Sequence, residues 1–171
     1  DIKDLIATLF AGNAQMDMYK NYKNLLLGDG FNNKSEKYIK MQKYINMKTQ
    51  NKYNFLNMFD DIINTKYSSL INNLVMTYRN SNISTIMLLQ YGKLLSKSNR
   101  ANANNIIIFR SHNMETKKDM IDVFLKDRFI RMGLLKGNDM IKYYDEVTEN
   151  YGFFYIHNGA IPTFSTHRLS L

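Results

Sequence analysis

The sequence predicts an α/β protein in which a mainly parallel β-sheet is covered by helices on both faces. Two observations carry this prediction. Short apolar runs rich in β-branched and aromatic residues recur from residue 54 onward, and such runs favour strands. The longer segments between them carry apolar residues at three- and four-residue spacing, which is typical of helices. Strands and helices in alternation, with nearly continuous apolar strands, indicate a parallel sheet.

Residues 1–50 are predicted to form a helical, polar N-terminal part. A Gly28-Asp29-Gly30 break follows a run of leucines. Asn33 and Glu36 then resemble a capping box, which predicts that a helix begins there. The lysine-rich stretch from 37 to 52 is interpreted as a solvated helix face or as a patch that faces DNA. The apolar residues at helical spacing are Ile2, Leu5, Ile6, Leu9 and Phe10 before the break and Tyr38, Met41 and Ile45 after the capping box.

Four apolar runs of strand length follow, and each is succeeded by a polar residue. We expect the strands that end at Phe59, Leu89 and Phe109 to run parallel, since helical segments separate them. Their polar ends would then meet at one edge of the sheet. The runs are 55–59 before Asp60 and Asp61, 83–89 before Gln90, 106–109 before Arg110, and 153–156 before His157.

The segments between these runs are predicted to be helices over 66–79, 116–131 and 138–150. The second opens with Thr116 and Asp119, which form another capping-box signature. Nothing in the sequence marks an internal domain boundary, because it holds a single proline and no low-complexity linker. We therefore expect one domain.

Composition narrows the classes of function. The 171 residues include no cysteine and three histidines, which excludes a disulfide framework and disfavours a metal centre built on thiolates or imidazoles. No apolar run approaches the roughly 20 residues that span a bilayer, and an intracellular location is expected. The chain starts at Asp1 without a signal peptide or an initiator methionine. We expect it to begin inside a larger protein.

The net charge of +8 and the isoelectric point near 9.5 suggest a polyanionic partner. Abundant Asn, Lys, Ile and Tyr also indicate a coding sequence biased toward A and T, so part of the lysine excess is interpreted as compositional drift. The charge therefore does not choose between an enzyme and a nucleic-acid-binding module.

Ligands of parallel α/β sheets gather at the carboxyl ends of the strands, where Asp60 and Asp61 follow the first run. A carboxylate there can hold the hydration shell of a nucleotide-bound Mg²⁺, and a second acid can orient the attacking water. The alternative is that the two acids cap the following helix. Gln90 could contact a γ-phosphate or a catalytic water, or it could simply end a strand.

Two arginines in polar segments beside the second run are further candidates. Arg79 and Arg100 could stabilise phosphoryl charge in their own or a neighbouring subunit, although solvated surface arginines are the alternative. The main difficulty for nucleotide binding is that no Gly-x-x-x-x-Gly-Lys-[Ser/Thr] motif occurs in these residues.

Three blocks of this sequence together resemble the viral genome-packaging ATPases of the FtsK/HerA superfamily, the kind found in poxviruses, other large nucleocytoplasmic DNA viruses and virophages. Residues 55–61 resemble the Walker B strand with its double acid, and 78–90 resemble the sensor strand with its terminal Gln. Residues 98–110 resemble an Arg-x-Asn segment and the strand after it. A looser similarity covers 148–156, with Arg168 beyond. The resemblance extends over about residues 50 to 170.

The resemblance implies a three-layer, mainly parallel P-loop NTPase fold of the RecA/ASCE type, with a helical N-terminal part, that uses ATP and Mg²⁺ to drive DNA packaging. Asp60 would hold Mg²⁺ through water, Asp61 would be the catalytic acid, and Gln90 would sense the γ-phosphate. Arg79 and Arg100 would be candidates for the trans-acting arginine of a homo-oligomeric ring. The implied partners are double-stranded DNA and capsid components, and the implied location is the host cytoplasm, a viral factory or the virion.

This sequence departs from the family because the P-loop strand and its Lys-[Ser/Thr] motif should precede residue 1. We interpret the chain as the carboxy-terminal two thirds of such an ATPase domain, a fragment or part of a split gene, or else as a degenerate relative that does not bind ATP. By itself it is expected to be inactive. The alternatives are a non-catalytic nucleic-acid-binding or virion structural protein, and an unrelated α/β enzyme in which Asp60, Asp61 and a divalent metal cleave phosphodiesters.

Overall fold

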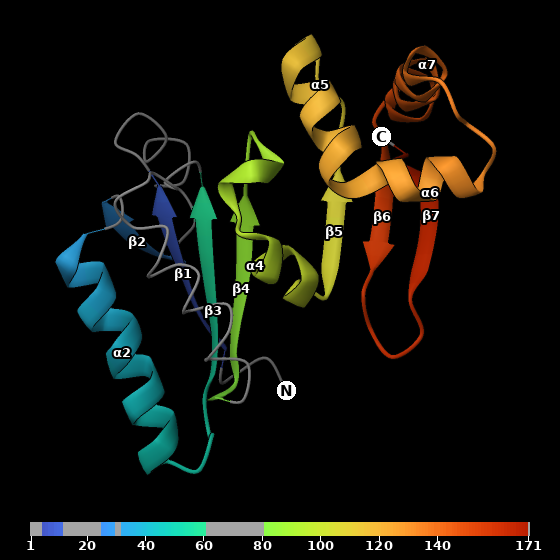
Figure 1. Cartoon of the computed structure of the whole chain (residues 1–171). Coiled ribbons are helices and arrows are strands. Elements are labelled where there is room, and N and C mark those ends of the chain that lie inside the picture. Colours follow the sequence, from blue (N-terminus) through green and yellow to red (C-terminus); the bar gives the residue numbers. More distant parts are fainter. Residues whose placement is uncertain (1–4, 12–24, 30–31, 61–80, 171) are drawn as a thin grey trace. The chain divides into compact units, whose positions relative to one another are not determined.

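The computed structural model describes residues 5–11, 25–29, 32–60 and 81–170. The chain divides into two compact units, Asp1–Leu89 and Gln90–Leu171. Figure 1 shows the elements of both units, and each unit is described below by itself.

The first unit is built on a four-stranded sheet in the order β2-β1-β3-β4. All three neighbouring pairs are parallel. The register places Ala11 beside Asp60 and Asp60 beside Leu88, so the strands end together at one edge. The predicted parallel pairing of the first two apolar runs is thereby confirmed. The strands are β1 (Leu5–Ala11), β2 (Leu25–Asp29), β3 (Asn54–Asp60) and β4 (Ile83–Leu88).

The prediction of helix at the start of the chain was wrong, because β1 occupies residues 5–11. It is an interior strand, and its last four residues, Thr8 to Ala11, are all buried. Strands covered on both faces do not alternate between polar and apolar residues. The apolar run therefore matched a helical spacing by chance, because an almost continuous run fits either period.

The leucine run that was expected to end a helix belongs to β2 instead. Gly28 lies within this strand and pairs with Phe10 of β1. A Cβ atom at Gly28 would lie 2.6 Å from Cδ1 of the Phe10 ring. The glycine therefore makes room for a core aromatic ring and does not mark a break.

Helix α2 (Asn33–Lys48) confirms the helix expected after that run, although it is capped one residue earlier than predicted. The side chain of Asn32 accepts hydrogen bonds from the backbone N–H groups of Lys34 and Ser35, at 2.8 and 3.3 Å. Ser35 Oγ accepts in return from the Asn32 N–H, which completes the capping box. Glu36, predicted to close the box, pairs with Lys40.

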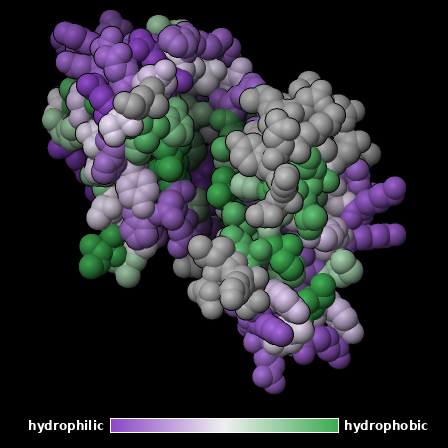
Figure 2. Space-filling view, turned by 180° about the vertical axis from the view of Figure 1, so that it is seen from behind, coloured by the Kyte–Doolittle hydropathy of each residue, from purple (hydrophilic) through white to green (hydrophobic). Residues whose placement is uncertain are grey.

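The face that α2 buries agrees only in part with the expected one: Tyr38 and Ile45 pack against the core. Met41 was predicted to face the core but is 50% exposed, whereas Gln42 and Asn46 are fully buried. Ile39 is the main apolar contact of the helix with the sheet. The lysines stay on the outer side, and Figure 2 shows hydrophilic side chains projecting at the edge of the unit that carries α2. The core residues are Phe10, Ile39, Phe55, Phe59 and Ile83.

The second unit contains a three-stranded antiparallel sheet in the order β5-β6-β7. The prediction that the strand ending at Phe109 belongs to the same parallel sheet was therefore wrong: β5 lies in this second sheet and pairs with β6 antiparallel, with Ile108 opposite Phe154. The helical segment between these strands returns to the end of the sheet where β5 stops (Figure 1), so β6 must run the opposite way. The strands are β5 (Asn105–Ile108), β6 (Gly152–His157) and β7 (Thr163–Arg168).

Helices cover one face of this sheet and enclose an aromatic core around Phe129, Tyr144 and Phe154. The predicted helices over 116–131 and 138–150 are confirmed, although the first starts earlier. Its cap is Asn113, whose side chain accepts from the Thr116 N–H at 3.0 Å. The predicted helix 66–79 lies outside the described residues. The helical elements are the 3₁₀ turn η3 (Gly92–Leu94), α4 (Lys97–Asn102), α5 (Met114–Met120), the π-helical turn η4 (Ile121–Leu125), α6 (Lys126–Arg131) and α7 (Gly137–Thr148).

Candidate functional site

Asp60 is the last residue of β3, an interior strand that pairs with β1 and β4 on its two sides. The preceding residue, Phe59, is buried and stacks on Phe10 with ring centroids 5.1 Å apart. Successive side chains of a strand point to opposite faces, so Asp60 projects on the face away from that stacked pair. The core thus places a half-buried carboxylate at the carboxyl edge of the parallel sheet.

A buried amide pair fixes α2 over this strand. Gln42 Nε2 donates to Asn57 Oδ1 at 3.0 Å, and Asn57 Nδ2 donates to Gln42 Oε1 at 2.8 Å. Asn46, one helical turn later, donates to the carbonyl oxygens of Tyr53 and Ser81 at 2.9 and 2.6 Å. These bonds join the helix to β3 and to the segment before β4, which sets the position of the strand that carries Asp60.

A carboxylate at the end of a strand can serve Mg²⁺, which does not need a cage made only of protein ligands. Mg²⁺ keeps several waters and is held by one or two carboxylates together with substrate phosphates. Within the described residues, no cluster of three or more His, Cys, Asp or Glu side chains could hold a metal ion. The oxygen chemistry of Asp60 is compatible with Mg²⁺, and its role in holding that ion remains a prediction.

Two of the predicted site residues, Asp61 and Arg79, lie outside the described residues, and their roles remain predictions. Gln90 is the second residue after β4 and is exposed. Its strand ends beside β3, because Leu88 pairs with Asp60. The proposed sensor role of Gln90 also remains a prediction.

Arg100 lies in α4, a short helix capped by Ser96, whose hydroxyl accepts from the Asn99 N–H at 3.2 Å. Its guanidinium Nη1 donates to the carbonyl oxygens of Leu95 and Gly92, at 2.5 and 3.4 Å. These carbonyls hold the half-buried side chain in one position. Its predicted role as a trans-acting arginine remains untested.

Arg100 also lines an open pocket of about 450 Å³ that the sequence did not reveal. The walls come from η3, α4, η4 and α6, and β5 and β6 contribute apolar residues. Sequence reasoning missed the other cations around Arg100. The spacing of Lys97 and Arg100 was the available signal, since residues three apart share one side of a helix.

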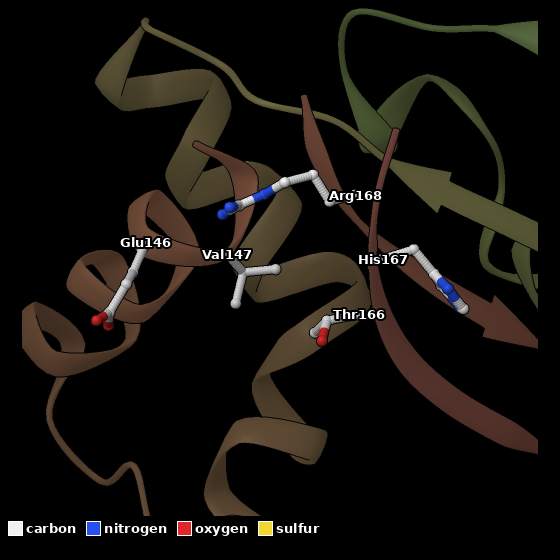
Figure 3. Close-up of a pocket in the computed structure, with 5 residues that line it drawn as sticks. All are labelled: Glu146, Val147, Thr166, His167 and Arg168. Atoms are coloured by element: carbon white, nitrogen blue, oxygen red, sulfur yellow. The ribbon is translucent and has the colours of Figure 1, made fainter. Parts of the chain in front are cut away.

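A second pocket, of about 360 Å³, lies between α7 and β7 (Figure 3). Glu146 and Val147 come from α7, and Thr166, His167 and Arg168 come from β7. Figure 3 shows that His167 and Arg168 point to opposite sides of their strand. His167 stacks on Phe153 with centroids 5.4 Å apart, and its Nε2 lies 2.7 Å from Ser165 Oγ. Its side chain therefore does not converge with Arg168 on one reacting centre.

No helix in the described ranges is both long enough and apolar enough to cross a membrane.

Comparison with known proteins identifies a fold. No protein-family model matches the sequence, and no curated protein matches it. The genome packaging NTPase B204 from Sulfolobus turreted icosahedral virus 2 in complex with AMPPCP matches with a TM-score of 0.57 and 12% identity, over 97% of this chain and 84% of that chain. The same NTPase in complex with sulfate gives 0.60 and 13%, over 97% and 83%. B204, the DNA-packaging ATPase from Sulfolobus turreted icosahedral virus, gives 0.57 and 12%, over 95% and 82%.

At these identities the likeness shows the fold alone. The chain shares the α/β fold of viral packaging NTPases, with a four-stranded parallel sheet and several helices. The resemblance predicted from the sequence is confirmed at that level.

Proposed function

We propose that this chain is part of an ATP-hydrolysing motor that moves double-stranded viral DNA into a capsid. One observation carries the proposal: β3 places Asp60 at the carboxyl edge of a parallel sheet, directly beside the end of β4. Sheets of this kind bind ligands at that edge. The fold matches packaging NTPases that were solved with ATP analogues, which supports nucleotide chemistry there.

In this motor each residue at the edge has a separate task. Asp60 binds the hydration shell of Mg²⁺, which neutralises phosphate charge when it is bound. Asp61 orients the water that attacks the γ-phosphate in line and accepts its proton. Gln90 donates a hydrogen bond to the γ-phosphate or to that water. The chain thus contributes positioning and electrostatic stabilisation.

The proposal extends to an assembly of the FtsK/HerA type, in which subunits form a homo-oligomeric ring around DNA at the capsid. Arg79 or Arg100 from one subunit would stabilise phosphoryl charge in the next. The lysines on the outer side of α2 would contact the DNA backbone without reading its sequence. These 171 residues contain no Gly-x-x-x-x-Gly-Lys-[Ser/Thr] motif, so the proposal assigns no phosphate-binding loop.

The second candidate is a non-catalytic nucleic-acid-binding or virion structural protein with the same fold. The observation that favours it is charge: the net charge is +8, and most of the lysines on α2 are exposed. Such a protein would bind DNA through phosphate contacts and would need no catalytic acid.

The two candidates differ in what Asp60 and Asp61 do in the full-length gene product. For the motor, Asp61→Asn should leave Mg·ATP binding largely intact and lower turnover by about 100-fold, because the attacking water loses its acid. Asp60→Asn should weaken Mg²⁺-dependent binding as well. Steady-state ATPase rates and nucleotide titrations measure both effects. Asp127→Asn, an exposed acid on α6, is the matched control.

Equal and small effects of Asp60→Asn and Asp61→Asn would contradict the motor and indicate helix capping. DNA binding that persists without any ATPase activity in the full-length product would favour the second candidate.

A further inference from the structure

The pocket beside Arg100 is strongly basic. Lys93, Lys97, Arg100 and Arg128 line it, and Asp122 is the acid among its lining residues. All of the lining residues belong to the second unit, so the pocket is complete within that unit. Several fixed cations around one cavity form a site for an anion.

Three of these cations have no carboxylate partner among the described residues. Lys93 forms an ion pair with Asp119. None of the ion pairs among the described residues involves Lys97, Arg100 or Arg128. Backbone carbonyls hold both guanidinium groups instead, since Arg128 Nη1 donates to the Phe124 carbonyl at 2.9 Å. A guanidinium has five N–H donors, so each arginine keeps several for a ligand.

The electrostatic environment of Arg128 points the same way. Burial lowers the pKa of its guanidinium and the nearby charge of Arg131 lowers that pKa further, whereas the charge of Asp127 raises it. A cation whose charged form is disfavoured by burial and by a like charge gains from a bound anion.

The pocket wall is built by a π-helical turn, η4, which supplies Asp122, Val123 and Phe124. Such turns are rare and occur frequently at functional sites. Gly92 packs so closely against it that a Cβ atom there would lie 2.5 Å from Cε2 of the Phe124 ring. This contact brings η3, which carries Lys93 and the carbonyl that holds Arg100, against the turn.

We propose that this pocket binds a phosphate group, supplied either by a nucleotide or by a nucleic-acid backbone. Guanidinium and ammonium groups match phosphate oxygens in geometry and charge. The apolar residues Ile106, Phe124 and Ile156 surround the cations with a low-dielectric wall, which strengthens the attraction. The inference does not depend on the motor, because it requires no hydrolysis and neither Asp60 nor Asp61.

Binding of pyrophosphate to the 171-residue chain, measured by calorimetry without Mg²⁺, tests the pocket. Lys97 is the residue to change, because its side chain is exposed and has no partner among the described residues. Lys97→Ala should weaken pyrophosphate binding about tenfold, and Lys97→Arg should retain it. Lys142→Ala removes the same charge from the exposed side of α7 and should change affinity by less than about twofold. Thermal melts should show all variants folded, because Lys97 and Lys142 are both exposed.

Two further titrations identify the source of the phosphate. ATP without Mg²⁺ and a labelled 20-base-pair duplex are each added to the chain, with pyrophosphate as competitor. Competition with ATP alone assigns the pocket to a nucleotide, and competition with the duplex alone assigns it to the nucleic-acid backbone. For the duplex, Lys97→Ala should also reduce the dependence of log affinity on log salt by about one.

Absence of pyrophosphate binding, or equal losses in Lys97→Ala and Lys142→Ala, would overturn the proposal. The motor is tested by ATP turnover and the pocket by pyrophosphate binding without Mg²⁺, so a failure of the motor and a failure of the pocket remain distinguishable.

Discussion

Different interactions stabilise the interior of each of the two units. We call the first the amide unit and the second the aromatic unit. In the first, buried side-chain amides join α2 to the parallel sheet: Gln42, Asn46 and Asn57 are each at most 1% exposed and are hydrogen-bonded. In the second, aromatic rings fill the space between helices and the antiparallel sheet, and Phe154 contacts four other rings. Hydrogen bonds are directional and therefore fix the position of α2 along the sheet. The packing of aromatic rings depends instead on how well their volumes fill the core.

This difference matters for function because the amide bonds lie close to the candidate catalytic edge. Asn57 is three residues before Asp60 on β3, and its amide is bonded to the helix that covers the strand. The phosphate pocket proposed above instead rests on the aromatic unit. Phe124, on the pocket wall, is a neighbour of that aromatic core.

The largest expected effect is in the aromatic unit. Phe154→Ala removes a fully buried ring and should lower the free energy of unfolding by about 4 kcal/mol, from lost transfer energy and the cavity left behind. Phe153→Ala, at the adjacent and half-buried position, is the matched control and should cost about half as much. Urea denaturation measures both values.

Amide hydrogen exchange of Phe154→Ala sharpens the comparison between the units. If the units are held independently, protection should fall over β5–β7 and α7 while β1 and β3 keep theirs. An equal loss of protection in both units would show that they unfold as one body.

In the aromatic unit, the sequence predicted where strands lie along the chain better than how those strands pair. Apolar runs identified β5 and β6, but run length and composition carry no information on strand polarity. The edge strand β7 was missed, because its residues Thr163, Ser165 and Thr166 are polar and its apolar signal is weak. Without β7, the hairpin that begins the antiparallel sheet could not be recognised.

The amide unit was predicted well where a strand followed a conventional pattern and poorly where polar groups entered the core. Asp60 was found because it directly follows the apolar residues of β3. Gln42 and Asn46 were not among the residues expected to face the core, since buried amides look like surface residues until their partners are known. Likewise, the basic pocket depends on residues from 93 to 128 that only the tertiary fold brings together.

An intermediate effect is expected from the amide pair itself. Gln42→Met or Asn57→Leu alone leaves a buried amide without its partner and should cost about 2 kcal/mol each. The double variant replaces both by apolar groups of similar size, and it should cost clearly less than the sum of the two. A double-mutant cycle from denaturant melts gives the coupling. Strictly additive costs would show that the two amides do not depend on each other.

The smallest effect concerns a polar bond inside the aromatic unit. Tyr144 is buried, and its hydroxyl donates to the Phe109 carbonyl at 2.6 Å. Burial is the main cause that raises the pKa of Tyr144 from 10.0 to about 12. The folded chain therefore keeps the phenol proton at pH values where the unfolded chain has lost it. Stability from this group is complete below pH 10 and declines as the pH rises from 10 toward 12.

Tyr144→Phe isolates this contribution. At pH 7 it should cost about 1 kcal/mol, because the Phe109 carbonyl loses its donor. The loss of stability between pH 10 and 12 should also become shallower than in the unmodified chain, because the variant has no phenol to ionise. Tyr151→Phe, at an exposed tyrosine, should leave the slope unchanged. Parallel pH profiles for the unmodified chain and Tyr144→Phe would contradict the assignment of the alkaline slope to Tyr144.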